Sequence, residues 1–362
     1  MKRIIFAALS LGALLAPAML DAQTVRRNMA LYLNDGSVVR YAVNDITRIA
    51  FDVDSVSYTV STIAGTGSAA LTDGQGTAAA FKFPQGIVTA PDGSYWIVDR
   101  GNNAIRRMDA DYNVTTVAKS GSVTFSAPWQ GGFNAAGEYF VANKALNNII
   151  RIAADGTCSV FETTETFKSP MSVVFDASNN MYVSDRDNKA VKKFSPSGEV
   201  TVYDMSSCAS GPNCVAVDKR GRIFVGTGGT YRLHMFDTDG TMSTVIGTGT
   251  KPTTATYTDG TPGDLTSVPM GATVGMAFDA DDNLYIADYT MHTVRVLTPD
   301  ADGDYSKGTL KTIAGTPGVK GSADGEGDEA TFNCPSSVLA AGDTIYVTDE
   351  QSHKIRVISI NK

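Results

Sequence analysis

Short apolar and β-branched runs alternate with Gly, Asn and Asp turns along most of this chain. In residues 81–118 the runs predict four strands, at 86–90, 95–98, 104–108 and 114–117. The turns between them contain Pro91-Asp92-Gly93, Gly101-Asn102-Asn103 and residues 109–113. Strands this short at this spacing indicate a four-stranded antiparallel sheet, which buries both faces only when similar sheets pack against it.

The same unit is repeated along the chain. A polar residue, called here the marker residue, ends the second strand of each copy: Asp99, Asn143, Asp185, Thr227, Asp288 and Asp349. A Pro stands 15 residues before the marker in the first four copies and 14 before it in the last. Six copies at a pitch of about 42 residues predict one propeller blade for each copy. Polar loops containing Asp-Gly lengthen the last two spacings.

The strand count predicts how the ring closes. The sixth copy ends near Ile360 after only three strands, whereas an unused strand, YTVSTIA, runs from Tyr58 to Ala64. This strand matches the fourth strands LKTIA and STVIG of earlier copies. We therefore predict an all-β, six-bladed β-propeller with four-stranded blades, in which Tyr58–Ala64 completes the last blade and removes an exposed edge.

Three features of the first copy also occur in later copies: the entry Pro84-Gln85-Gly86, the strand WIVD, and the turn with Asn103 followed by Ile105-Arg106. This pattern resembles the NHL-repeat family over about residues 57–360. The resemblance implies an NHL-type propeller of a secreted bacterial protein. It also raises an enzyme function, because some such propellers are lyases or hydrolases with a metal near the central channel. The fourth copy departs most, with Thr227 as marker and GGTYRLHMF at its turn.

Residues 1–22 have the features of a secretory signal peptide, with Lys2 and Arg3 ahead of an apolar run and cleavage expected before Gln23. Residues 23–55 are expected to form a β leader with a hairpin around Asn34-Asp35-Gly36, similar to leaders of secreted proteins from Gram-negative bacteria. Residues 56–362 are the predicted propeller. We expect export to the periplasm or cell exterior, without a transmembrane segment once the signal is removed.

The net charge of −8 and the pI of about 4.9 indicate an acidic surface, whereas phosphate binding needs clustered Lys and Arg. The chain is therefore not expected to bind nucleic acid or anionic lipid. We expect a monomer. The four cysteines are Cys158, Cys208, Cys214 and Cys334. In an exported chain Cys208 and Cys214 could form a disulfide around a small loop, and the alternative is that all four are buried thiols.

The catalytic and metal candidates are few. His292 and His353 fall at the turn position of Asn103, and His234 falls at the position of Arg106, so all three are interpreted as residues of the repeat. The marker carboxylates could form a calcium-binding ring, but a short carboxylate before a turn also accepts backbone N–H groups. The loop at residues 300–304 begins like an EF-hand but has Tyr305 and Lys311 where Gly and Glu are required. We predict no cofactor, with calcium as the open alternative.

Blade geometry predicts where a ligand would bind. The loops that enter the first strands and the turns after the second strands lie on one face around the channel. On this face we select seven ligand-binding candidates: Arg100, Trp129, Lys144, Met171, Arg186, Tyr289 and Glu350. Aromatic rings flanked by cations can stack on a ring and pair with an acidic group.

The resulting hypothesis is an exported, non-enzymatic propeller that binds a glycan, peptide or protein partner on this face. Two alternatives stay open: a metal-dependent lyase or hydrolase acting in the channel, and a scaffold of the cell envelope. The fold alone does not choose between them, because propellers have many functions.

Overall fold

The computed structural model describes residues 28–32, 38–42, 56–119 and 121–362. Strands β1 (Asn28–Tyr32) and β2 (Val38–Ala42) pair in antiparallel fashion, as the alternation around Asn34-Asp35-Gly36 predicts. The turn itself and the predicted signal peptide lie outside the described residues. By its contacts, Val56–Lys362 is one compact unit.

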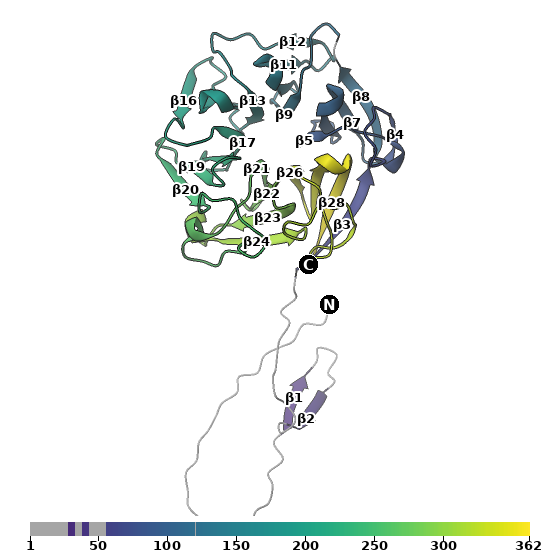
Figure 1. The fold of residues 1–362 in the computed structure, drawn as a ribbon, viewed down its shortest axis with the longest axis vertical. Coiled ribbons are helices and arrows are strands. Elements are labelled where there is room, and N and C mark those ends of the chain that lie inside the picture. The colour runs from purple at the N-terminus through teal and green to yellow at the C-terminus, as the bar shows by residue number, and fades with distance from the viewer. Residues whose placement is uncertain (1–27, 33–37, 43–55, 120) are drawn as a thin grey trace, which may run out of the picture. The chain divides into compact units, whose positions relative to one another are not determined.

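Residues 56–362 form six antiparallel sheets arranged as blades around one axis, which confirms the predicted propeller (Figure 1). The first three blades are β5–β8 (Pro84–Thr89, Tyr95–Asp99, Ala104–Met108, Asn113–Lys119), β9–β12 (Pro128–Phe133, Tyr139–Asn143, Asn148–Ile152, Cys158–Val160) and β13–β16 (Pro170–Phe175, Met181–Asp185, Ala190–Phe194, Val200–Asp204). The next two are β17–β20 (Pro212–Val217, Ile223–Thr227, Leu233–Phe236, Met242–Ile246) and β21–β24 (Thr273–Phe278, Leu284–Asp288, Thr293–Thr298, Thr309–Ala314).

The sixth blade combines both ends of the propeller. It contains β26 (Pro335–Ala341), β27 (Thr344–Asp349) and β28 (Lys354–Asn361), followed by β3 (Ser57–Ala64) as the fourth strand. β3 pairs with β28 from Ile360↔Tyr58 to Ile355↔Ala64, so the predicted closure is confirmed. Two-residue strands β4 (Gly74–Gln75) and β25 (Gly325–Glu326) extend the first and sixth blades.

The repeated spacing of the sequence is a strand register. Each of the first four markers pairs with the Pro that stands 15 residues before it, as in Pro84↔Asp99 and Pro170↔Asp185. In the sixth blade Pro335 pairs with Asp349. In the fifth blade Thr273, not a proline, pairs with Asp288. A register shift follows this pair in every blade, so the first strand bends at its entry.

The core consists of six apolar clusters, one at each interface between neighbouring blades. For example, Val98 and Ile105 of the first blade pack with Val141 and Ile150 of the second. The interface between the last and first blades is built in the same way, with Ile355 of β28 packed near Ile97 of β6. Each sheet is therefore covered on both faces by its neighbours, and the ring has no uncovered sheet face.

A short 3-10 helix follows the marker in four blades. These helices are η3 (Arg100–Asn102), η4 (Lys144–Leu146), η5 (Arg186–Asn188) and η8 (Glu350–Ser352). The residue after each helix has left-handed backbone, and the chain then enters the third strand. Because the blades repeat about one axis, these helices lie on one face of the propeller, and the first residue of each has the equivalent place.

Candidate functional site

Five of the seven predicted ligand-binding residues come from equivalent turns. Arg100, Lys144, Arg186 and Glu350 are the first residues of their 3-10 helices, and Tyr289 directly follows the marker Asp288. Trp129 and Met171 are second residues of first strands. Trp129 is half-buried, whereas Met171 is only 2% exposed, so the Met171 side chain does not face solvent.

Direct contacts join four of these residues. The Trp129 ring lies under two cations, with the Arg100 guanidinium 5.1 Å and the Lys144 ammonium 4.2 Å from its centroid. Arg100 also donates from Nη2 to Glu350 Oε1 at 2.6 Å, an ion pair between the first and sixth blades. Arg186 acts on the charge of Lys144, and Tyr289 and Glu350 act on each other. These six residues are called here the turn-face cluster: Arg100, Trp129, Lys144, Arg186, Tyr289 and Glu350.

Burial and neighbouring charges shift the pKa values of this cluster. Burial lowers the pKa of Lys144, and the positive charges of Arg186 and Arg100 lower it further. Burial raises the pKa of Glu350 above its ordinary value, although Arg100 and Tyr289 favour its ionised form. Burial and the nearby Glu350 carboxylate raise the pKa of the Tyr289 phenol. Perturbed titratable groups gathered on one surface are typical of functional sites.

The same region contains buried polar atoms that have no hydrogen-bond partner in the described part of the chain. They are both polar atoms of the Gln85 carboxamide, Nε1 of Trp129 and Nε of Arg100. Gln85 and Trp129 hold the equivalent entry position of neighbouring blades. An unpaired buried polar group costs about 1–3 kcal/mol, so this arrangement destabilises the folded state.

Sequence reasoning missed the role of Gln130, next to Trp129. Its Nε2 donates to the backbone carbonyls of Val274 at 2.9 Å and Ser336 at 3.1 Å. These carbonyls belong to the fifth and sixth blades, so one side chain of the second blade crosses the axis. Little in the sequence indicates this contact, because the other copies have no Gln at the position equivalent to Gln130.

The marker side chains cap the entry loop of their own blade. Asp99, Asp185 and Asp349 accept hydrogen bonds at 2.7 Å from the backbone N–H groups of Lys82, Lys168 and Asn333. Asn143 caps Ser126 in the same way. The marker residues therefore have a structural role. Among the described residues no group of three or more His, Cys, Asp or Glu is placed to hold a metal ion.

The loop at residues 300–304 is a turn organised by its first residue. Asp300 Oδ1 accepts from the backbone N–H groups of Asp302 at 3.0 Å and Asp304 at 2.8 Å. The Asp304 carboxylate accepts from the backbone N–H of Ser306, at the start of the next 3-10 helix. The acid spacing of this loop thus serves backbone capping.

All four cysteines are free thiols in the structure. Burial raises the pKa values of Cys208 and Cys214. Cys208 Sγ lies 3.8 Å from His234 Nε2, and His234 Nδ1 lies 3.2 Å from Thr244 Oγ1. The disulfide between Cys208 and Cys214 stays a prediction for the exported protein.

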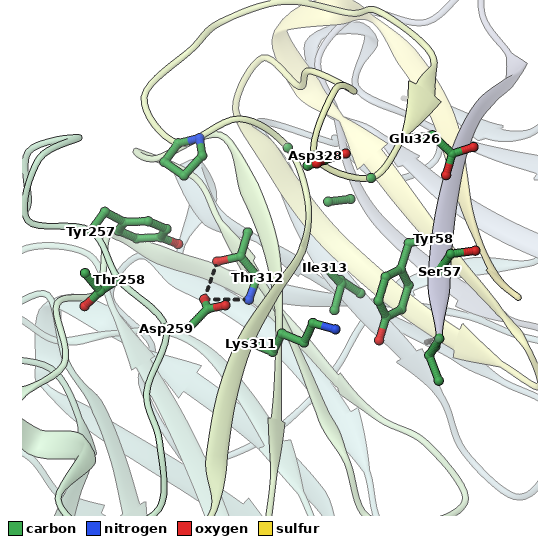
Figure 2. A pocket seen from close by; sticks show the side chains of 15 residues that line it. Ser57, Tyr58, Tyr257, Thr258, Asp259, Lys311, Thr312, Ile313, Glu326 and Asp328 are labelled. Atoms are coloured by element: carbon green, nitrogen blue, oxygen red, sulfur yellow. Dashed lines mark hydrogen bonds between the residues drawn. The ribbon is translucent and has the colours of Figure 1, made fainter. Parts of the chain in front are cut away.

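A pocket of about 630 Å³ lies away from the turn-face cluster, between the outer strands β24 and β3 (Figure 2). The Lys311 ammonium is 5.3 Å from the Tyr58 ring on one wall. Asp259, Glu326 and Asp328 make the pocket mainly acidic. Asp259 accepts hydrogen bonds from the backbone N–H and hydroxyl of Thr312 and therefore serves the fold.

The described residues include no helix with the length and apolar character needed to cross a membrane. No family model matches the chain, so membership of the NHL-repeat family is not established. No curated protein matches it either.

Solved structures share the fold. A protein of unknown function from Bacteroides thetaiotaomicron has a TM-score of 0.70 at 20% identity, covering 96% of this chain and 84% of its own. An auxiliary nutrient binding protein from the same organism has a TM-score of 0.69 at 17% identity, covering 93% and 84%. Virginiamycin B lyase from Staphylococcus aureus has a TM-score of 0.53 at 14% identity, covering 92% and 88%. At these identities the likeness shows the propeller fold alone.

Proposed function

We propose that this protein is a non-enzymatic binding propeller that recognises its ligand with the turn-face cluster. The observation that carries the proposal is the position of the Trp129 ring under Arg100 and Lys144. The six residues of this cluster come from five of the six blades, and the Arg100–Glu350 pair joins the first blade to the last, so the cluster depends on the closed ring. The likeness to an auxiliary nutrient binding protein supports a binding role.

The proposal includes export, which the predicted signal peptide supports. The protein would then bind its ligand in the periplasm or outside a Gram-negative cell. Fractionation of cells that express the full chain tests this part. Accumulation of a shortened chain in the periplasm or medium supports export, whereas full-length protein confined to the cytoplasm contradicts it.

A glycan and peptide array probed with the full chain tests the binding role. We expect Trp129→Leu to remove the signals of the ligands that the wild type binds. Lys311→Met is the matched control, because Lys311 also lies over an aromatic ring but in the outer pocket. Equal array signals for the wild type and Trp129→Leu, or loss of the signals in Lys311→Met alone, would show that the ligand does not bind at the turn-face cluster.

A metal-dependent lyase or hydrolase is the second candidate, because virginiamycin B lyase shares the fold. Incubation of each array ligand with the protein, before and after treatment with a chelator, separates the two functions. A binding protein returns its ligand unchanged in both cases. A cleaved ligand, with cleavage lost on chelation and restored by one divalent metal, would favour the enzyme.

A further inference from the structure

The positive charge of the turn-face cluster is not balanced. Arg100 is paired with Glu350, whereas Lys144 and Arg186 form no ion pair within the described residues. Lys144 is nevertheless partly buried, with its ammonium 4.2 Å from the Trp129 ring. The carboxylates of Asp187 and Glu350 attract the Lys144 ammonium, but neither forms an ion pair with it within the described residues.

This arrangement costs free energy when no anion is bound. Burial removes water from the Lys144 ammonium, and Arg186 and Arg100 repel it, so its pKa is lowered although the carboxylates of Asp187 and Glu350 attract it. An anion placed between Lys144 and Arg186 attracts both cations and so offsets the repulsion between them. The binding of an anion is therefore coupled to the charged state of Lys144.

Neutral polar groups in the same region also lack a hydrogen-bond partner among the residues that the structure describes. They are the carboxamide oxygen and nitrogen of the fully buried Gln85 and the indole N–H of Trp129. Such groups match hydroxyls, which donate and accept hydrogen bonds. The cluster thus combines the indole N–H donor of Trp129 with two cations that form no ion pair in the described part of the chain, and Gln85 of the neighbouring blade adds a donor and an acceptor at the equivalent entry position.

The Trp129 ring contacts two cations of the protein itself. Its main role is thus to position positive charge rather than to offer a free stacking surface, which differs from the stacking that the sequence suggested. From these observations we propose that the ligand is an acidic saccharide, an oligosaccharide containing uronic acid, whose carboxylate is held by Lys144 and Arg186. This inference rests on the proposed binding function.

Two other anionic ligands fit less well. A densely charged polyanion is repelled by the acidic remainder of the molecule, whereas a uronic-acid saccharide brings spaced single charges. Peptides are usually held by an open strand edge or an apolar groove, and the turn-face cluster instead presents charged side chains around an indole. A saccharide needs a few cations and hydroxyl partners.

The test is calorimetric titration of the full chain with oligomers of galacturonate, glucuronate and mannuronate. Each is compared with its carboxyl-reduced, neutral counterpart, and hexaglutamate is the peptide probe. We expect one uronate series to bind and its neutral counterpart to bind at least about tenfold more weakly. Lys144→Met and Arg186→Met should each weaken binding about tenfold, since each removes a charge-assisted contact. Lys311→Met should leave the affinity unchanged, and unaltered thermal unfolding shows that each variant is folded.

The outcomes separate this inference from the function on which it rests. Equal binding of acidic and neutral oligomers, still lost in Trp129→Leu, overturns the acidic saccharide but keeps the binding function. Binding of hexaglutamate without any uronate, weakened by Lys144→Met, replaces the saccharide by an acidic peptide. If no probe binds and the array is also blank, the binding function itself fails.

Discussion

His292 and His353 stand where the backbone is left-handed, with φ of 60° and 56°. Asn103 and Asn147 hold the equivalent positions, and Asn tolerates this conformation well. Each of these side chains accepts a backbone N–H of the next blade: Ala127 for Asn103, Ser169 for Asn147, Cys334 for His292 and Phe83 for His353. The two histidines thus accept the same inter-blade hydrogen bond as the asparagines, but only while Nδ1 carries no proton.

The stability of the propeller should therefore depend on pH through His353. Burial, together with the charge of Lys82, lowers the pKa of His353 below 6.5. A lowered pKa in a basic group means that the unfolded chain binds the proton first, so stability is retained above pH 6.5 and decreases as the pH falls below it. His353→Asn keeps a hydrogen-bond acceptor at every pH. Between pH 7.5 and 5.5 its free energy of unfolding should therefore decrease by about 1 kcal/mol less than that of the wild type. Denaturant unfolding at both pH values measures the difference.

The reverse variant is the control for this prediction. Asn147→His places an imidazole at the equivalent turn, where Ser169 N–H is the donor. It should gain the pH dependence that His353→Asn loses. Identical pH profiles for the wild type and both variants would show that these side chains do not join the blades.

At the scale of the strand, the marker residue and the residue seven positions later change together. Where the marker is Asp, the later residue is a buried cation: Arg106, Lys192, Arg295 or Arg356. Where the marker is Asn143 or Thr227, the later residue is Ile150 or His234. Asp99 and Arg106 lie 2.9 Å apart with no exposed side-chain surface. The fold therefore accepts a buried pair of charges or none.

Removal of one member of such a pair should lower the free energy of unfolding more than removal of both members. Arg106→Ile leaves the Asp99 carboxylate buried alone, which should cost about 3–5 kcal/mol of unfolding free energy. Adding Asp99→Asn reproduces the Asn143–Ile150 combination of the second blade and should recover about 1–3 kcal/mol. Chemical denaturation of the two single variants and the double variant gives this coupling energy.

The pH gives an independent check of the same prediction. Burial raises the pKa of Asp99, and loss of Arg106 removes a group that opposes this rise. An acid with a raised pKa contributes stability below the unfolded pKa and loses it as pH rises, so Arg106→Ile should regain stability in acid. Strictly additive single effects with unchanged pH profiles would refute the coupling.

The long Asp-Gly loops use the same cations. The loop carboxylates Asp73, Asp259 and Asp324 contact Arg106, Arg295 and Arg356 at 2.8, 3.3 and 2.6 Å. Each also accepts a hydroxyl of an outer strand: Thr116, Thr312 and Thr62. These loops therefore tie the fourth strand to the third, a role that the repeated Asp-Gly pattern alone did not reveal.

The fold was predictable because the repeated signal is a strand register. The 15-residue offset between Pro84 and Asp99 spans one hairpin, and its recurrence gives the number of blades. The site was predictable only as a set of positions. The pair Arg100–Glu350 joins residues 250 apart, and Met171 is buried whereas its equivalent Trp129 is only half-buried. Such orientations depend on packing between blades, which local patterns do not contain.

At the scale of the whole molecule, one strand holds the ring closed. β3 is the only part of the described N-terminal half of the chain that enters the sixth blade, and its Val60 is buried with Ile345 and Ile358 of that blade. The pair Arg100–Glu350 and the hydrogen bond from Phe83 N–H to His353 cross the same junction. Closure and the turn-face cluster therefore depend on the same contact between first and last blades.

Truncation should expose this dependence. A chain that begins at residue 65 lacks β3, so it leaves the β28 edge unpaired and uncovers Ile345 and Ile358. A chain that begins at residue 56 retains every strand of the propeller. We expect cooperative thermal unfolding and a monomeric elution volume for the longer chain, and aggregation or a broad transition for the shorter one. A separate peptide of residues 56–67 should restore cooperative unfolding to the shorter chain, because the missing contacts are those of one strand. If both chains unfold alike without the peptide, closure by β3 contributes little, and the Arg100–Glu350 pair must be held by the remaining blades.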